Sequence, residues 1–231
     1  IWPVRDQWTR ANENLFSAWL EKLFDDPIDA APSWPALHEV LRDPSRNILF
    51  NHLGLREDEK GLIIRPDCAD LPYFLRAYFA FKLGLPFGYA KCSRGGAGKP
   101  PRCTSWWDIQ NLEPPPETVD DKTPAPSFFE GLFGGPPAGA PGKPKPKPQG
   151  LVMGFGTYLG ETVANAVHSG SGRAPAASDN TDYYSVPLSE DTLRPGTVYI
   201  DPYGHILVVV RRVAQTPEAA GVILAVDGQP D

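Results

Sequence analysis

The stretch that decides the fold reads RPDCADLPYFLRAYFAFKLG over residues 65–84. From Leu71 onward its apolar side chains recur at helical spacing, and Gly84 is a residue type that commonly follows the last turn of a helix. Pro72 is tolerated only near the first turn of a helix. The pattern therefore predicts a helix that ends near Gly84 and carries Cys68 at or next to its N-terminus.

The predicted position of Cys68 favours chemical reactivity. Unpaired backbone N–H groups and the helix dipole stabilise an anion at a helix N-terminus, and the thiolate is the nucleophilic form of cysteine. Asp70 lies within about one turn of the thiol, and its negative charge would oppose formation of the thiolate. The alternative is that Cys68 is a buried cysteine that packs as a small apolar residue.

Helical and strand-like patterns occupy different parts of the chain. Apolar spacing predicts further helices over about residues 6–25, 35–42 and 152–167. Short β-branched segments separated by turn residues predict strands over 197–200, 205–213 and 221–226. Because regular βαβ alternation is absent, we expect an α+β fold in which N-terminal helices pack on one face of a C-terminal antiparallel sheet.

A proline-rich insertion divides the chain. Residues 113–149 hold 11 prolines and end in a Lys-Pro alternation over 143–148. Proline lacks the backbone donor that a helix or a central strand needs, so we expect a flexible or polyproline-type segment, of a kind that partner proteins recognise. We expect the helical half, 1–112, and the β-rich half, 150–231, to form one catalytic domain together. Residues 169–182 are rich in small and polar side chains and predict a long surface loop.

Two residues in the β-rich half could assist a cysteine. His205 follows Gly204 at the start of an apolar strand, where an imidazole can reach past the sheet edge toward a thiolate. Asp227 ends the next predicted strand, and it could fix the tautomer of His205 if the two strands are neighbours. Each residue also has a simpler interpretation, as a solvated histidine and as part of an Asp-Gly turn. His168 is the reserve candidate, whereas His38 and His52 fit structural roles.

The sequence around these residues resembles the papain-like superfamily, which includes the NlpC/P60 and CHAP amidases and the transglutaminase-like proteins. The segments CADL at 68–71, FLRA at 74–77 and LGLPFGY at 83–89 are similar to the nucleophile helix of that superfamily and its continuation. The segments LRPGTV at 193–198 and GHILVV at 204–209 are similar to the NlpC/P60 and CHAP approach to the histidine strand. The resemblance implies Cys68 as nucleophile, His205 as base and Asp227 as the orienting third residue.

The implied activity is acyl transfer through a thioester, without a cofactor. Hydrolysis of an amide bond in a peptide or peptidoglycan-type substrate is the first expectation; transamidation, as in transglutaminase-like proteins, and a noncatalytic binding or scaffold module are the alternatives. Four aromatic residues are candidates for the substrate groove, although adjacent tryptophans often serve packing. They are Trp106, Trp107, Tyr89 and Tyr203.

The other two cysteines bear on the compartment. Cys92 and Cys103 bracket a loop that a disulfide could close, with about 3 kcal/mol of stabilisation from loop entropy. One disulfide and one free nucleophile are typical of an exported thiol enzyme, so together with the resemblance they favour a periplasmic or secreted protein. Reduced thiols in the cytosol are the alternative. Two cysteines without a nearby histidine or third cysteine fit a metal site poorly, and we expect none.

Charge and hydropathy exclude two classes of partner. The chain has 22 Lys and Arg against 28 Asp and Glu, a net charge of −6, which argues against binding to a nucleic-acid backbone. No run approaches the roughly 18 apolar residues that would cross a bilayer.

Overall fold

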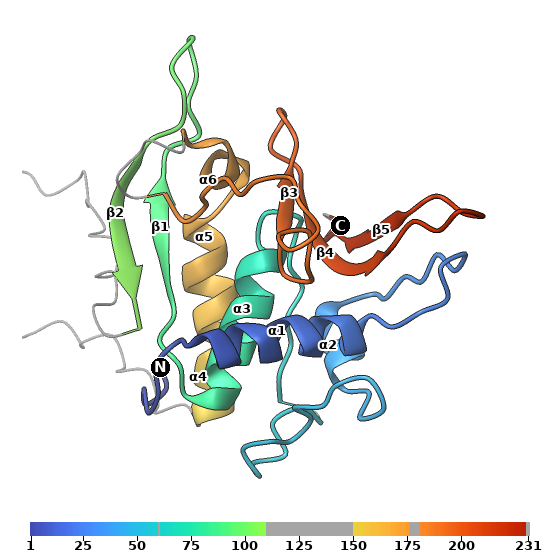
Figure 1. Cartoon of the computed structure of the whole chain (residues 1–231). Helices are drawn as coiled ribbons and strands as arrows, with labels where there is room; N and C mark the ends of the chain where they lie inside the picture. The colour runs from blue at the N-terminus through green and yellow to red at the C-terminus, as the bar shows by residue number, and fades with distance from the viewer. Residues whose placement is uncertain (60, 110–149, 176–180, 230–231) are drawn as a thin grey trace, which may run out of the picture. The chain divides into compact units, whose positions relative to one another are not determined.

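The computed structural model describes residues 1–59, 61–109, 150–175 and 181–229 (Figure 1). The insertion 113–149, and with it the expectation of a flexible or partner-binding segment, lies outside these ranges. Residues 1–112 and 150–231 group into one unit. In chain order its elements are α1 (Arg10–Leu23), α2 (Leu37–Leu41), α3 (Leu71–Leu83), β1 (Gly88–Cys92), β2 (Cys103–Asp108), α4 (Leu151–Thr157), the π-helical turn η1 (Tyr158–Val163), α5 (Ala164–Ala166), α6 (Ser169–Arg173), β3 (Val198–Ile200), β4 (Ile206–Val213) and β5 (Val222–Val226).

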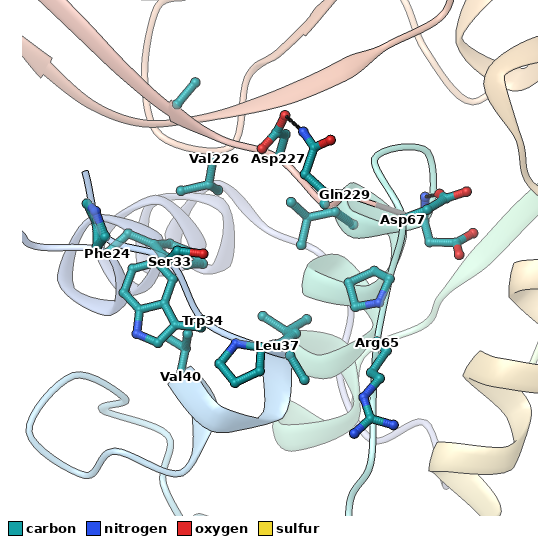
Figure 2. A pocket seen from close by; sticks show the side chains of 18 of the residues that line it. Phe24, Ser33, Trp34, Leu37, Val40, Arg65, Asp67, Val226, Asp227 and Gln229 are labelled. Atoms are coloured by element: carbon teal, nitrogen blue, oxygen red, sulfur yellow. Dashed lines mark hydrogen bonds between the residues drawn. The ribbon is translucent and has the colours of Figure 1, made fainter. Parts of the chain in front are cut away.

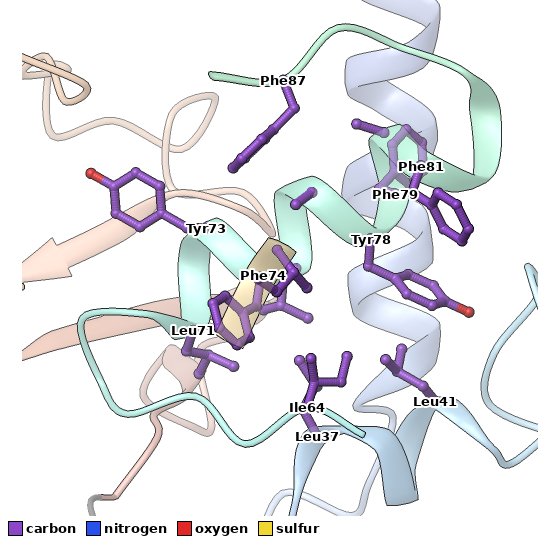
Figure 3. Close-up of a cluster of buried hydrophobic side chains, with 14 of the residues drawn as sticks. Leu37, Leu41, Ile64, Leu71, Tyr73, Phe74, Tyr78, Phe79, Phe81 and Phe87 are labelled. Atoms are coloured by element: carbon purple, nitrogen blue, oxygen red, sulfur yellow. The ribbon is translucent and has the colours of Figure 1, made fainter. Parts of the chain in front are cut away.

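Helix α3 forms the centre of the hydrophobic core (Figure 3). Its residues from Tyr73 to Phe81 are buried on almost every side, apart from a partly exposed Arg76. Gly84 ends the helix in the left-handed region, at φ 65°, which a glycine adopts without the penalty of a Cβ. The expected helix and its end near Gly84 are therefore both present.

Helix α1 packs across α3 through aromatic rings. Trp19 stacks on Tyr78 with ring centroids 5.5 Å apart, and Phe16 meets Phe79 edge to face at 5.2 Å. Thr9 caps α1 by accepting a hydrogen bond from the Asn12 N–H. Aromatic pairs of this geometry add to the stabilisation that burial alone provides.

The C-terminal strands form a three-stranded antiparallel sheet in the order β3-β4-β5. Both α1 and α3 contact the central strand β4, and Val208 and Val210 of that strand belong to the same core as the helices. The chain is therefore a mixed α and β protein with an antiparallel sheet, as the hydrophobic patterns predict. Within the described ranges, no helix has both the length and the apolarity to cross a bilayer.

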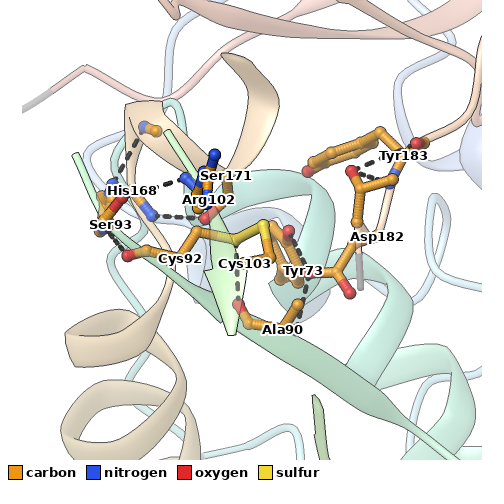
Figure 4. The surroundings of a disulfide bond; sticks show 12 residues. Tyr73, Ala90, Cys92, Ser93, Arg102, Cys103, His168, Ser171, Asp182 and Tyr183 are labelled. Atoms are coloured by element: carbon orange, nitrogen blue, oxygen red, sulfur yellow. Dashed lines mark hydrogen bonds between the residues drawn. A yellow bond between two sulfur atoms is a disulfide. The ribbon is translucent and has the colours of Figure 1, made fainter. Parts of the chain in front are cut away.

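A second antiparallel sheet, the hairpin β1–β2, is not predicted from the sequence. Its strands flank the loop 93–102, and a disulfide joins Cys92 to Cys103 across the pair (Figure 4). The sequence signal is weak because β1 begins at a glycine and both strands are short. Trp106 compensates for this glycine: its ring covers Gly88, where an added Cβ would come within 2.2 Å of the ring.

Two predicted segments differ in detail from the structure. The helix expected over 152–167 widens into the π-helical turn η1 between α4 and α5. The stretch 169–182 is more than a surface loop, because it contains α6 and because the partly buried Asp182 is hydrogen-bonded to α3 and β1 (Figure 4). Asp182 accepts hydrogen bonds from the Tyr73 hydroxyl at 2.7 Å and the Ala90 N–H at 2.8 Å, and its burial raises the pKa of its carboxyl. Composition alone does not reveal these long-range bonds.

Candidate functional site

Cys68 lies in the tight turn that leads into α3. The Asp67 carboxylate caps this turn by accepting hydrogen bonds from the N–H groups of Ala69 at 2.8 Å and Asp70 at 2.9 Å. The Leu71 N–H donates to the Asp67 carbonyl at 3.0 Å, which closes one turn directly in front of α3. Cys68 thus lies in the turn that precedes the N-cap Asp70, next to the helix N-terminus rather than within the helix.

The Cys68 thiol is free and half-buried. In the described part of the chain, neither the thiol nor the Cys68 N–H makes a hydrogen bond. An N–H at the start of a helix that has no internal partner can donate to an oxyanion. Cys68 therefore combines a nucleophile with a hydrogen-bond donor at one position.

His205 and Asp227 are brought together by the pairing of β4 and β5. His205 immediately precedes β4 and Asp227 immediately follows β5, and the antiparallel register places the start of one strand beside the end of the other. The His205 Nε2 lies 2.9 Å from Asp227 Oδ2, and Gln229 donates a second hydrogen bond to the same oxygen at 2.7 Å. The turn before β4 also holds His205, whose N–H donates to Asp201 at 2.9 Å.

The Asp227 carboxylate determines which ring nitrogen of His205 is available. A carboxylate accepts a hydrogen bond, so the neutral imidazole carries its proton on Nε2. Nδ1 then has a free lone pair, and within the described ranges it has no hydrogen-bond partner. This is the nitrogen that could accept the proton of a thiol.

Gly228 brings the His205–Asp227 pair to the turn that carries Cys68. An added Cβ at Gly228 would come within 2.5 Å of the Asp67 carbonyl oxygen, so only glycine fits at this contact. Asp227 immediately precedes Gly228, and Cys68 immediately follows Asp67. Each of the two residues is therefore one Cα–Cα step, about 3.8 Å, from this contact along the chain. The thiol itself is not hydrogen-bonded to His205 among the described residues. The structure thus joins two of the three candidate residues and places the third on the adjoining segment.

A pocket of about 570 Å³ opens beside this junction (Figure 2). Residues on both sides of Cys68 in the sequence line it, together with Asp227 and Gln229, whereas the side chains of Cys68 and His205 do not. Its apolar lining includes Phe24, Trp34 and Val226. Polar groups make up more of its exposed lining than apolar groups, so the pocket suits a ligand with polar as well as apolar parts. Trp34 and Gln229 were not predicted as site residues from the sequence; the signal that could have indicated Trp34 is its position in a Pro-Ser-Trp-Pro loop.

Asp70 is a buried carboxyl in the wall of this pocket, 9% exposed. Burial, and then the negative charge of Asp67, raise the pKa of Asp70 to about 7. Its carboxyl is therefore half protonated near neutral pH. The protonated carboxyl carries no charge, so the electrostatic repulsion between Asp70 and a Cys68 thiolate is weaker than expected for a fully ionised carboxylate.

The raised pKa of Asp70 predicts a pH-dependent stability. The native state holds the proton up to about pH 7, whereas the unfolded state loses it near pH 4, so stability falls as the pH rises between these values and is lowest above pH 7. We expect Asp70→Asn to raise the free energy of unfolding at pH 8, by at most about 4 kcal/mol, and to change it little at pH 4. Urea unfolding of both proteins across this range measures the effect, and a parallel pH dependence in the two would contradict it.

The candidate aromatic residues do not gather at this pocket. Tyr89 is buried, at 1% exposure, and is out of reach of a substrate on the surface. Trp107 packs against the core, and Trp106 lines a separate pocket of about 280 Å³ beside Trp8. Tyr203 is 88% exposed in the turn just before His205. The sequence shows the aromatic character of these residues but not the direction of their side chains.

His168, the reserve candidate, has a structural role (Figure 4). Its Nδ1 accepts a hydrogen bond from the Gly170 N–H, which caps α6, and its Nε2 donates to the Cys92 carbonyl at 2.7 Å. Burial lowers its pKa, so the ring is neutral. His38 is likewise buried against the backbone of Ile64. Neither histidine competes with His205 for the role of base.

Comparisons with protein families, with curated proteins and with solved structures gave no match. Among the described residues, no three His, Cys, Asp or Glu side chains gather in a way that could hold a metal ion.

Proposed function

We propose that the chain is a cysteine-dependent amide hydrolase of the papain-like type, with Cys68 as nucleophile, His205 as base and Asp227 as the orienting residue. The observation that carries the proposal is the 2.9 Å hydrogen bond between His205 and Asp227, held by Gly228 against the turn that bears a free cysteine. A thiol, an imidazole with one free nitrogen and a carboxylate are the parts that nucleophilic cysteine catalysis needs.

The proposed reaction proceeds in two steps. His205 Nδ1 accepts the proton of the Cys68 thiol, and the sulfur attacks the carbonyl carbon of an amide. The resulting oxyanion accepts a hydrogen bond from the Cys68 N–H, and His205 then protonates the leaving amine as the thioester forms. Water, deprotonated by His205, hydrolyses the thioester and restores the thiol. Asp227 stabilises the imidazolium in both steps.

A peptide of peptidoglycan type is the substrate that we propose. Support comes from the resemblance of the cysteine and histidine segments to NlpC/P60 and CHAP amidases, and from a pocket large enough for a peptide side chain beside the junction. The Cys92–Cys103 disulfide favours an oxidising compartment, in agreement with a periplasmic or secreted enzyme. Transfer of the acyl group to an amine, as in transglutaminase-like proteins, would use the same triad.

A noncatalytic binding module is the second candidate. It is favoured by the missing hydrogen bond between Cys68 and His205 among the described residues. The reactivity of Cys68 separates the two candidates. At pH 6.5, iodoacetamide should label Cys68 at least ten times faster in the native protein than in urea, and His205→Ala should remove the difference. Equally slow labelling in both states would favour the binding module.

His205 and Asp227 should differ in their effect on turnover. We expect His205→Ala to lower kcat/KM for muropeptide hydrolysis by about 10³-fold, because general acid–base catalysis is lost. Asp227→Ala should cost less, about 10- to 100-fold, because the hydrogen bond from the His205 N–H to Asp201 still holds the turn that carries the imidazole. Asp191→Ala removes an exposed carboxylate outside the site and should leave turnover unchanged. Product analysis by mass spectrometry measures all three, and an Asp227→Ala loss as large as that of His205→Ala would contradict the ranking.

A further inference from the structure

A lysine and two carboxylates meet in the core, away from the proposed active site. Lys82, in the last turn of α3, places its Nζ 2.5 Å from Glu57 Oε1 and 2.5 Å from Asp58 Oδ2. All three side chains have 0% exposure to solvent. The proposed hydrolase mechanism uses none of them.

The loop that precedes α3 is folded so that two consecutive carboxylates face one amine. Asn51 and Arg56 adopt left-handed backbone conformations, with φ 50° and 55°, which non-glycine residues rarely take. Such conformations persist where the surrounding structure holds them in place. The loop therefore brings Glu57 and Asp58 to Lys82 at a conformational cost.

Glu57 is held as an anion. Its Oε1 accepts a hydrogen bond from the Leu53 N–H at 2.8 Å and its Oε2 one from the Leu55 N–H at 3.1 Å. Burial by itself raises the pKa of Glu57, but the hydrogen bonds from Lys82 and from the backbone outweigh it and hold the pKa below its ordinary value. Its Oε1 also accepts a hydrogen bond from the Lys82 amine, so Glu57 lies in direct line to take a proton from that amine.

The two carboxylate oxygens of Asp58 have different hydrogen-bond partners. Its Oδ1 accepts a hydrogen bond from the Tyr78 hydroxyl at 2.7 Å, while its Oδ2 faces Lys82 and accepts from the Asn51 N–H at 2.7 Å. Burial, and then the charge of Asp58, raise the pKa of Tyr78, so the hydroxyl keeps its proton and remains a donor. A donor on one oxygen of a carboxyl makes its carbon more susceptible to a nucleophile.

We propose that Lys82 and Asp58 are joined by an amide bond between Nζ and Cγ, formed within the folded chain with Glu57 as the proton carrier. Glu57 takes a proton from the Lys82 ammonium, and the free amine attacks Cγ of Asp58. The Nζ–Cγ bond forms and the Cγ–Oδ2 bond breaks. Glu57 passes the proton that it took to Oδ2, which leaves as water together with the second proton lost by the nitrogen, so Glu57 returns to its carboxylate form and no oxidant or other reactant is needed.

The burial of the three side chains favours this reaction. Separated charges are costly where bulk solvent does not reach, and a desolvated lysine is a nucleophile. The product is a neutral amide, which replaces the ammonium and one carboxylate and leaves Glu57 bound to its two backbone N–H groups. The bond would tie the last turn of α3 to the loop at residues 51–58.

The intact mass of the chain tests the proposal. We expect the full chain, purified with its disulfide, to be lighter by one water than the sequence mass corrected for that disulfide. Trypsin cleaves after Arg56, Lys60, Arg76 and Lys91, so the bond would link peptide 57–60 to an uncleaved peptide 77–91. A chain of full mass that releases peptide 77–82 overturns the proposal, and so does a water loss that maps to a single linear peptide.

Two variants test the roles of the residues. Lys82→Met should give the full sequence mass, because the amine is absent. Glu57→Gln should also give the full mass while keeping the native far-ultraviolet circular dichroism, because the proton carrier is lost. A Glu57→Gln chain that still carries the linked peptides would overturn the role of Glu57. If this variant does not fold, the tryptic map of the unaltered chain still decides whether the bond exists.

Discussion

Replacing Cys68 by alanine is expected to reduce amide hydrolysis by at least about 10³-fold, because no other group at the junction can form the thioester. The side chain is half-buried and makes no hydrogen bond within the described ranges, so its removal should cost less than about 1 kcal/mol of stability. Activity and folding are therefore expected to separate in this variant.

Two measurements establish that separation. Mass spectrometry of muropeptides follows hydrolysis, and urea unfolding followed by tryptophan fluorescence follows stability. Asp191→Ala, which keeps the whole triad, is the matched control for handling and purity. Full turnover in Cys68→Ala would contradict the assignment of Cys68 as the nucleophile. An unfolded Cys68→Ala chain would show that the thiol is needed for packing of the core.

The largest effect on stability is expected from Lys82→Met. This change removes both the proposed amide bond and the amine that Glu57 and Asp58 face, and it leaves two buried carboxylates without a partner; removing one partner of a buried ion pair costs about 3–5 kcal/mol. The loss should extend to the network around them, since Tyr78 donates to Asp58 and accepts a hydrogen bond from Asn47 at 2.8 Å. Urea unfolding at pH 7 measures the change.

Lys22→Met provides the comparison for Lys82→Met. Lys22 is an exposed residue on α1, and its replacement by the same side chain should change the free energy of unfolding by less than about 0.5 kcal/mol. Equal stability of the two variants would mean that the buried cluster contributes nothing net. A chain that tolerates Lys82→Met would also make the proposed Lys82–Asp58 bond unimportant for folding.

Much of the fold could be predicted from local pattern. The apolar spacing of α1 and α3, the stop at Gly84 and the β-branched segments of β3–β5 all depend on neighbouring residues in the sequence, and the structure contains each of them. The hairpin β1–β2 and helix α6 were missed because their strands and helix are short, and because they are stabilised by a disulfide and by hydrogen bonds between distant segments. Such contacts leave little trace in a local pattern.

The candidate site, like the fold, could be predicted from local sequence only in part. Local sequence shows which residue types could do the chemistry, because a cysteine at a helix entry and a histidine and an aspartate at strand ends are local features. The pairing of β4 with β5, which brings His205 to Asp227, and the close contact of Gly228 with Asp67 come from tertiary packing. Tertiary packing also buries Tyr89 and places Lys82 between two carboxylates. These outcomes depend on which distant surfaces pack together, and the free energy of packing is shared among residues that no short stretch of sequence contains.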